Sequence, residues 1–411
     1  MVRADELDVW LHGRRVAVVS RHRDRLDLAY TEEALAEYPL GIPLLSLSLP
    51  LVPERYTKGR VHPFLDGLLP EGEPRRVAAE DFDLLASDTF GLLRALGRDC
   101  AGAIVVQPAG DGPPPEPSTL AAEPLDDGEL EALVANLRSA PLGTSRRVRV
   151  SLAGVQEKLV LTRMPDGRWG SPVDGSPTTH LLKPELAEYP ATVANEAFCM
   201  RTALYLGLPV AHVETMTVGG RPLLVVERFD REIDADGIVV RFHQEDLAQA
   251  TGIPPDKKYQ EDGGPSLARI ASVLQSVAAT DARDALLRMA TLNVVVGNGD
   301  AHAKNFSLLH RRSGAVDLAP AYDVLSTLHY GDERLAMYVD DVRRIQRVTG
   351  ERLMNEAAAW GLARDRAMHV VTDVLERLPE ATARAREETD AVPDDLVRLV
   401  EGQAERLRTS F

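Results

Sequence analysis

The hydrophobic pattern of this chain changes once along its length, and this change constrains the fold more than any other feature. Between residues 129 and 235, short apolar stretches typical of strands dominate, for example RPLLVVERFDR at 221–231. From residue 244 onward, apolar residues recur at helical spacing, as in DARDALLRMATLNVVV at 281–296. The pattern predicts an α+β protein in which a strand-rich lobe, 129–235, precedes a helical lobe, 236–411.

A smaller region precedes these lobes. Residues 7–30 contain three short apolar stretches that predict strands, and AGAIVVQP, at 101–108, predicts another. DTFGLLRALG predicts a helix that Asp88 caps and Gly97 ends. We therefore expect a small mixed α/β domain over 1–108. Residues 109–128 are rich in proline, glycine and acid and predict a linker, because such a segment cannot bury a core.

The composition limits where the protein acts and what it binds. A formal net charge of −16 repels DNA phosphates, so contact with DNA would need a basic patch or a partner protein. Two distant cysteines, Cys100 and Cys199, do not suggest a disulfide framework and fit a reducing compartment. The start MVRADELDVW lacks the apolar core of a signal peptide, and no apolar run is long enough to span a membrane. We expect a cytoplasmic protein without membrane contact.

The stretch GNGDAHAKNF, at 297–306, places dense polar residues between two apolar segments. Asp300 and Asn305 have the spacing of a kinase catalytic loop, in which Asp acts on the attacking hydroxyl and Asn holds Mg²⁺. Lys304 could steady the transferred phosphate, and a further acid, Asp323, follows a hairpin expected around Ser313 and Gly314. Taken alone, this spacing also fits a polar turn whose side chains cap backbone groups. A metal-hydrolase site is a weaker alternative, because the required upstream Asp and His clusters are missing from the sequence.

Three segments of the strand-rich lobe could bind a nucleotide. SLAGVQEKLVL, at 151–161, has one glycine, Gly154, beside which backbone amides could approach phosphates; a strand with a bulge there is the alternative. Lys183 ends an apolar strand and is either solvated or paired with phosphates, with Glu196 as its ionic partner. The backbone of 227–229 could face adenine, although a buried strand ending in a charged turn explains the same residues.

Together these segments resemble the HipA family of bacterial serine/threonine kinases. The motifs SLAGVQEKL, HLLKP, NEAFCMRTALYLGL, LLVVERFDR, QEDLAQATG, KYQEDGGP, GNGDAHAKNFSLL and LAPAYDVL occur in family order between residues 151 and 327. The N-terminal region is similar to the companion domain of full-length HipA proteins. The resemblance implies a protein-kinase-like two-lobed fold of the HipA type, with ATP and Mg²⁺ as cofactors.

The resemblance also implies residue roles. Asp300 would be the catalytic acid/base, assisted by Lys304, and Asn305 and Asp323 the metal ligands. Ser151 matches the serine that the family autophosphorylates. The residues that would line the nucleotide are Ala153, Gly154, Val155, Gln156, Glu157, Lys158, Lys183, Glu227, Arg228, Phe229, His302, Ala303, Lys304, Asn305, Tyr322 and Asp323.

Family partners follow from the same resemblance. Its members phosphorylate aminoacyl-tRNA synthetases, glutamyl-tRNA synthetase best known, and bind a HipB-like helix-turn-helix antitoxin that carries the complex onto operator DNA. The expected function is thus a serine/threonine protein kinase that acts as the toxin of such a pair. Two alternatives stay open: a kinase-fold enzyme for a lipid or small molecule, and a non-catalytic module that binds the antitoxin.

Overall fold

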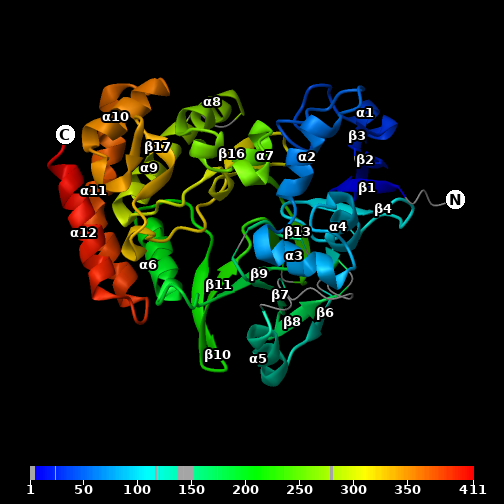
Figure 1. The fold of residues 1–411 in the computed structure, drawn as a ribbon, viewed down its shortest axis with the longest axis horizontal. Helices are drawn as coiled ribbons and strands as arrows, with labels where there is room; N and C mark the ends of the chain where they lie inside the picture. The colour runs from blue at the N-terminus through cyan, green and yellow to red at the C-terminus, as the bar shows by residue number, and fades with distance from the viewer. Residues whose placement is uncertain are drawn as a thin grey trace. The chain divides into compact units, whose positions relative to one another are not determined.

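The computed structural model describes residues 5–411 except 24, 116–117, 120, 138–141, 143–150, 155, 174, 235 and 278–280. The chain forms two compact units (Figure 1). Unit 1 comprises Met1–Lys183 and Glu227–Asp256, and unit 2 comprises Pro184–Val226 and Lys257–Phe411. Strands concentrate in unit 1 and long helices in unit 2, so the chain is α+β, as the hydrophobic pattern predicts.

The N-terminal part of unit 1 is an antiparallel sheet in the order β3-β2-β1-β4, with helices packed against it. The three strands expected over 7–30 are confirmed. The helix expected at 88–97 is also confirmed: the Asp88 side chain accepts from the Gly91 amide, and Gly97 ends the helix. The elements are β1 (Glu6–Leu11), β2 (Arg14–His22), β3 (Arg25–Tyr30), α1 (Glu32–Glu37), α2 (Lys58–Gly67), α3 (Gly72–Asp81), α4 (Thr89–Leu96) and β4 (Ile104–Pro108).

The rest of unit 1 contains strands in the order β9-β7-β8-β6 and a small sheet in the order β12-β13-β5. Two of these strands come from the segment expected to be a linker: β6 pairs with β8, and β5 pairs with β13. Segment 109–128 is thus partly built into sheets. The elements are β5 (Ser118–Thr119), β6 (Ala122–Pro124), α5 (Asp127–Ala135), β7 (Leu159–Arg163), β8 (Trp169–Pro172), β9 (His180–Pro184), β12 (Arg231–Ile233), β13 (Ile238–Arg241), β14 (His243–Asp246) and α7 (Leu247–Thr251).

Unit 2 is a helical body that carries three antiparallel hairpins, β10–β11, β15–β16 and β17–β18. Helix α11 packs against α6, α9 and α12, as Figure 1 shows. The elements are α6 (Thr192–Tyr205), β10 (Val213–Val218), β11 (Arg221–Glu227), η2 (Gln260–Asp262), α8 (Leu267–Val277), α9 (Ala282–Val296), η3 (Ala303–Asn305), β15 (Ser307–His310), β16 (Val316–Leu318), η4 (Leu328–Tyr330), β17 (Arg334–Val339), β18 (Val342–Arg344), η5 (Ile345–Arg347), α10 (Gly350–Ala359), α11 (Arg364–Glu387) and α12 (Asp394–Arg408).

The expected helices of unit 2 form where the sequence places them. Two aspartates occupy the first turn of α12 and two arginines its last turn, an arrangement that the helix dipole favours. Helices α10 and α11 also lie within the helical lobe expected over 236–411, and α11 accommodates Pro379 in its interior. Among the described helices, none has both the length and the apolar character of a membrane span.

Candidate active site

The first part of the loop 297–306 is fixed by its surroundings in unit 2. Helix α9 ends at Gly297, and the Asn298 amide donates to the Asn293 carbonyl at 2.7 Å. The Gly299 amide donates to Thr327 Oγ1 at 2.8 Å, and the Asp300 amide donates to Asn298 Oδ1 at 3.2 Å. These bonds define the backbone conformation of this part of the loop.

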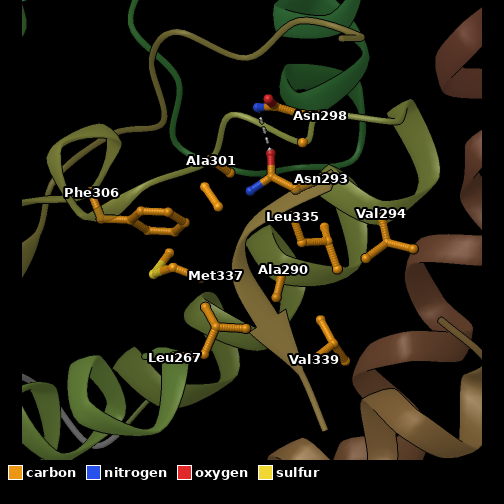
Figure 2. A pocket seen from close by; sticks show the side chains of 12 residues that line it. Leu267, Ala290, Asn293, Val294, Asn298, Ala301, Phe306, Leu335, Met337 and Val339 are labelled. Carbon is orange, nitrogen blue, oxygen red and sulfur yellow. Dashed lines mark hydrogen bonds between the residues drawn. The ribbon is translucent and has the colours of Figure 1, made fainter. Parts of the chain in front are cut away.

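One side of this loop is apolar. Figure 2 shows Ala301 and Phe306 reaching from the loop into a pocket that side chains of α8, α9 and β17 line, among them Leu267 and Met337. At the edge of this pocket, Asn298 Nδ2 donates to Asn293 Oδ1 at 3.1 Å. Burial of the Ala301 and Phe306 side chains anchors the loop on this side. The polar residues between them are therefore held in fixed positions.

Asp300 is a carboxylate whose environment suits a general base. Tyr259 Oη donates to Asp300 Oδ1 at 2.8 Å. Burial raises the pKa of Asp300, and the nearby negative charge of Asp323 raises it further, while the hydrogen bond from Tyr259 opposes both effects. The resulting pKa is about 6. A general base works best when its pKa lies near the pH at which the enzyme operates.

His302 acts through its backbone and as a neutral ring. Its amide donates to the Asp300 carbonyl at 2.7 Å, and its carbonyl accepts from the Asn305 amide at 2.9 Å. Burial, together with the charge of Lys258, lowers the pKa of His302 to about 3. The ring lies edge-on to Tyr259, with 5.3 Å between centroids, and Nδ1 has no hydrogen-bond partner among the described residues. His302 thus braces the loop through its backbone bonds.

Asn305 and Asp323 lie side by side, with Asn305 Nδ2 donating to Asp323 Oδ2 at 2.8 Å. This bond turns Asn305 Oδ1 away from Asp323; that oxygen is buried and has no partner within the described part of the chain. Asp323 has a φ of 58°, a left-handed conformation that is uncommon for a residue with a side chain and concentrates at functional sites. An orphaned amide oxygen beside a carboxylate fits the oxygen ligands that Mg²⁺ takes.

Neighbouring segments hold Asp323 and the loop in register. The hairpin expected around Ser313 and Gly314 is confirmed as β15–β16. After it, Ala321 bonds with residues 209 and 211, and Tyr322 Oη donates to the Lys304 carbonyl at 2.6 Å. Unit 2 thus brings together six predicted site residues, Asp300, His302, Lys304, Asn305, Tyr322 and Asp323, with Ala303 buried among them. No cluster of three or more His, Cys, Asp or Glu side chains suited to a metal occurs in the described ranges.

Unit 1 contains the other predicted group, in a loop before β7. The strand begins only at Leu159, so the alternative of a bulged strand at Gly154 is wrong. Lys158 Nζ donates to the Ala153 carbonyl at 2.7 Å, and Gly154 has a φ of 120°. A Cβ at Gly154 would lie 2.5 Å from Lys158 Nζ, so a side chain there would displace the lysine. Gln156 and Glu157 complete the loop; Val155 lies outside the described residues.

Ser151 and Lys183 are buried in unit 1. The Ser151 amide donates to the Asp99 carbonyl at 2.9 Å, and Ser151 Oγ donates to the Leu68 carbonyl at 2.6 Å. Lys183 lies in β9, which pairs with β7. Glu196, the ionic partner expected from the sequence, is buried on α6 in unit 2, and its pairing with Lys183 stays a prediction.

Arg228 uses its side chain for structure. Its guanidinium donates to Asp230 Oδ2 at 2.8 Å and to Asp99 Oδ2 at 3.2 Å, in a buried network that Arg231 and Arg241 complete. Burial raises the pKa of Asp99, but the three arginine charges outweigh that effect and hold it below its usual range. The backbone amide of Arg228 also donates to the Thr179 carbonyl at 2.9 Å, and its carbonyl accepts from the Arg231 amide at 3.2 Å, so the adenine-facing role of the backbone of 227–229 stays a prediction.

Sequence reasoning gave no role to two residues of these sites. Asp99 belongs to no recognisable motif. Its partners Thr178 and Arg228 lie 79 and 129 positions further along the chain. Tyr259 lies in the motif KYQEDGGP, but nothing in that motif indicates the bond to Asp300, 41 residues further on.

Comparisons with known proteins show the family of the chain. Residues 150–382 match the HipA-like C-terminal domain, and residues 7–107 match the HipA N-terminal domain. The chain is 39% identical to Y4mE of Sinorhizobium fredii, whose name describes a presumed kinase, over 98% of this chain and 99% of that protein. It is 32% identical to the serine/threonine-protein kinase toxin HipA of Shewanella oneidensis, over 80% of this chain and 77% of that one.

A solved structure adds the fold. The Shewanella oneidensis complex of HipA, HipB and its operator DNA matches with a TM-score of 0.81 and 28% identity, over 98% of this chain and 96% of that chain. The predicted HipA-type fold is confirmed. The chain therefore belongs to the HipA family and is a HipA-like serine/threonine protein kinase of the toxin class.

Proposed function

We propose that this kinase transfers the γ-phosphoryl group of ATP to a serine or threonine of a protein, with Asp300 as the catalytic residue. The observation that carries the proposal is one cluster in unit 2: the Asp300 carboxylate in a fixed loop, with the Asn305–Asp323 pair beside it. Phosphoryl transfer depends mainly on positioning and charge neutralisation, and this cluster supplies both.

The residues divide the chemistry as follows. Asp300 accepts the proton of the attacking hydroxyl, whose oxygen forms a bond to the γ-phosphorus while the bond to the ADP oxygen breaks. Lys304 offsets the charge of the phosphoryl group. Asn305 Oδ1 and the Asp323 carboxylate would hold Mg²⁺, which when bound neutralises phosphate charge. In unit 1, the 153–158 loop, Lys183 and the backbone at 227–229 are proposed to bind the nucleotide.

We expect Asn305→Ala and Asp323→Asn to weaken ATP binding in the presence of Mg²⁺ and to leave binding without Mg²⁺ nearly unchanged. Each change removes an oxygen ligand of Mg²⁺ or its charge, and both residues are proposed to reach the nucleotide through that ion. Calorimetric titration with and without Mg²⁺ measures both. The control is Asp317→Asn, on β16 of the hairpin that separates Asn305 from Asp323 in the sequence, and this variant should behave as wild type. Wild-type Mg²⁺ dependence in both variants would contradict the role of metal ligands and would favour the alternative in which Asn305 and Asp323 cap backbone groups of turns.

Ser151 is proposed to inactivate the enzyme when phosphorylated. A phosphate carries a charge of about −1.5 to −2, which the buried position beside the Leu68 carbonyl cannot accept. The segment must therefore leave its place and take the adjacent 153–158 loop with it, so ATP affinity should fall. Because the hydroxyl is buried, transfer should occur between molecules once the segment is released, and its rate should rise with protein concentration.

Mass spectrometry after incubation with ATP should find phosphate on Ser151 in the active protein and none in Asp300→Ala. Ser151→Asp should lose ATP binding, whereas Ser151→Ala should keep it. Fully phosphorylated protein that binds ATP as tightly as before would refute self-inactivation but not the kinase assignment.

The substrate and partners are proposed from family membership. We propose an aminoacyl-tRNA synthetase as the substrate, with glutamyl-tRNA synthetase as the first to test, so that phosphorylation inhibits translation. We propose a HipB-like antitoxin as the partner, since the Shewanella oneidensis relative was solved with HipB and operator DNA. The net charge of −16 supports DNA contact through that partner.

Incubating the protein with γ-labelled ATP and a lysate of its host, followed by identification of the labelled species, tests this function. A labelled synthetase supports it. Label confined to lipid or small molecules would replace the protein-kinase proposal with the corresponding alternative. The Asp300→Ala protein in the same lysate shows which label depends on this enzyme.

A further inference from the structure

Tyr259 occupies a loop whose backbone is tightly fixed in unit 2. It directly precedes η2, and the Gly264 amide donates back to its carbonyl at 2.8 Å. A Cβ at Gly264 would lie 2.7 Å from that carbonyl oxygen, so the loop can close this tightly only with glycine there. The next residue, Gln260, accepts from the Tyr338 amide of β17 at 2.8 Å. The loop therefore presents the Tyr259 side chain from a constant position.

The Tyr259 hydroxyl reaches the carboxylate proposed to do the chemistry. Its oxygen lies 2.8 Å from Asp300 Oδ1, while its ring packs edge-on against His302 at an interplanar angle of 82°. The Asp300 backbone is fixed separately, by Asn298 Oδ1 and by the His302 amide. Backbone bonds alone leave the terminal torsion of an aspartate broad, so among the described residues the Tyr259 hydroxyl is the donor that sets the direction of the carboxylate.

We propose that Tyr259 is a positioning residue of phosphoryl transfer: its hydroxyl holds Asp300 Oδ1 and so turns Oδ2 toward the attacking hydroxyl of the substrate. The proposal rests on the proposed catalytic role of Asp300. When Tyr259 holds Oδ1, the other carboxylate oxygen, Oδ2, stays available for the substrate hydroxyl. The productive orientation of Asp300 is then set before the substrate arrives.

The same hydrogen bond acts on the charge of Asp300. Burial, Asp323 and Asp332 raise the pKa of Asp300, whereas Tyr259 and Lys258 lower it, and the neutral His302 ring lies beside them. Removing the hydroxyl removes one lowering contribution, so the pKa of Asp300 rises. A base must be ionised to accept a proton, and therefore the acid side of the kcat profile should move to higher pH.

The test compares Tyr259→Phe with Tyr338→Phe. Tyr338 is a matched control, because its hydroxyl is buried without a hydrogen-bond partner in the described part of the chain. Tyr259→Phe keeps the ring against His302 and should lower kcat about ten- to a hundred-fold, the effect of one hydrogen bond to a charged group, with the KM for ATP unchanged. Its acid limb should shift upward, and Tyr338→Phe should match wild type in both respects.

The outcomes separate the inference from the function on which it rests. A Tyr259→Phe enzyme with wild-type kcat and pH profile, beside an inactive Asp300→Ala enzyme, would overturn the role of Tyr259 alone. An active Asp300→Ala enzyme would overturn both. Tyr259→Ala adds a check for space filling: if Phe restores full activity where Ala does not, the ring and not the hydroxyl is what matters, and the proposal fails. Assays are run below the thermal transition of each variant, so a loss of stability does not enter the comparison.

Discussion

Asp300→Ala should reduce phosphoryl transfer about a hundred- to ten-thousand-fold, the usual cost of losing a catalytic acid/base, while ATP binding stays largely intact. The reason is that Asp300 acts on the attacking hydroxyl, whereas the phosphates are assigned to other residues. Steady-state kinetics with a protein substrate, together with calorimetric ATP titration, give both quantities. Turnover within a few-fold of wild type would remove Asp300 from the mechanism.

Two further variants test whether the loss of activity in Asp300→Ala comes from the missing catalytic group and not from a loss of stability. Asp332→Ala removes a negative charge that acts on Asp300 but has no assigned role, and should stay close to wild type. Asp300→Asn should be at least as stable as wild type at neutral pH. The folded-state pKa of Asp300 lies above its ordinary value, so the folded protein binds this proton more tightly and stability falls as pH rises through about 6. Asparagine escapes that loss, and thermal unfolding at neutral and acidic pH measures the difference.

Asp99→Ala should destabilise the protein by about 3–5 kcal/mol, because it leaves buried arginine charges without their partner. Asp99 accepts from Thr178, Arg228 and Arg231, and its side chain is fully buried. Urea unfolding measures the change as a fall in the transition midpoint. The network also fixes Arg228 within the proposed adenine-facing backbone and Asp230 and Arg231 directly after it, so ATP affinity should fall with stability.

The control is Asp111→Ala, which breaks a salt bridge with Arg98 that is partly exposed to solvent. Exposed pairs contribute about 0–1 kcal/mol, because water screens them and both side chains lose freedom. Equal midpoints for Asp99→Ala and Asp111→Ala would show that the buried network adds nothing to stability beyond an ordinary surface pair.

Much of the candidate site follows from short-range sequence patterns. The spacing of Asp300 and Asn305, the hairpin around Ser313 and Gly314 and the acid after it all lie within about 25 residues, at positions that local turns and strand pairing set. The motif order then pointed to the family, which the comparisons confirm. Roles of individual residues stay predictions, since spacing places side chains near one another without fixing their orientation.

Other features exceed the reach of any local pattern. Segment 109–128 has the composition of a linker, yet Ala122–Pro124 gains the partner strand β8 from a distant part of unit 1 and becomes a strand itself. The composition of a segment indicates how much apolar surface it can bury by itself. Pairing with a neighbouring strand adds contacts and hydrogen bonds that the composition does not indicate. Helix α11 contains a proline and lacks a side-chain cap, but it packs against α6, α9 and α12. Tertiary packing thus outweighs its weak local signals.

The sequence by itself determined the α+β class, the helix ends marked by Asp88 and Gly97 and the polar loop that carries Asp300, because periodicity, caps and turns act between close neighbours. Only the tertiary structure decided what those residues touch. It placed the Arg228 side chain in a buried network with Asp99, left Asn305 Oδ1 without a partner among the residues that the structure describes and brought the Tyr259 hydroxyl onto the Asp300 carboxylate. These contacts join residues from 18 to 129 positions apart, and their geometry exists only once the chain has closed the loops between them.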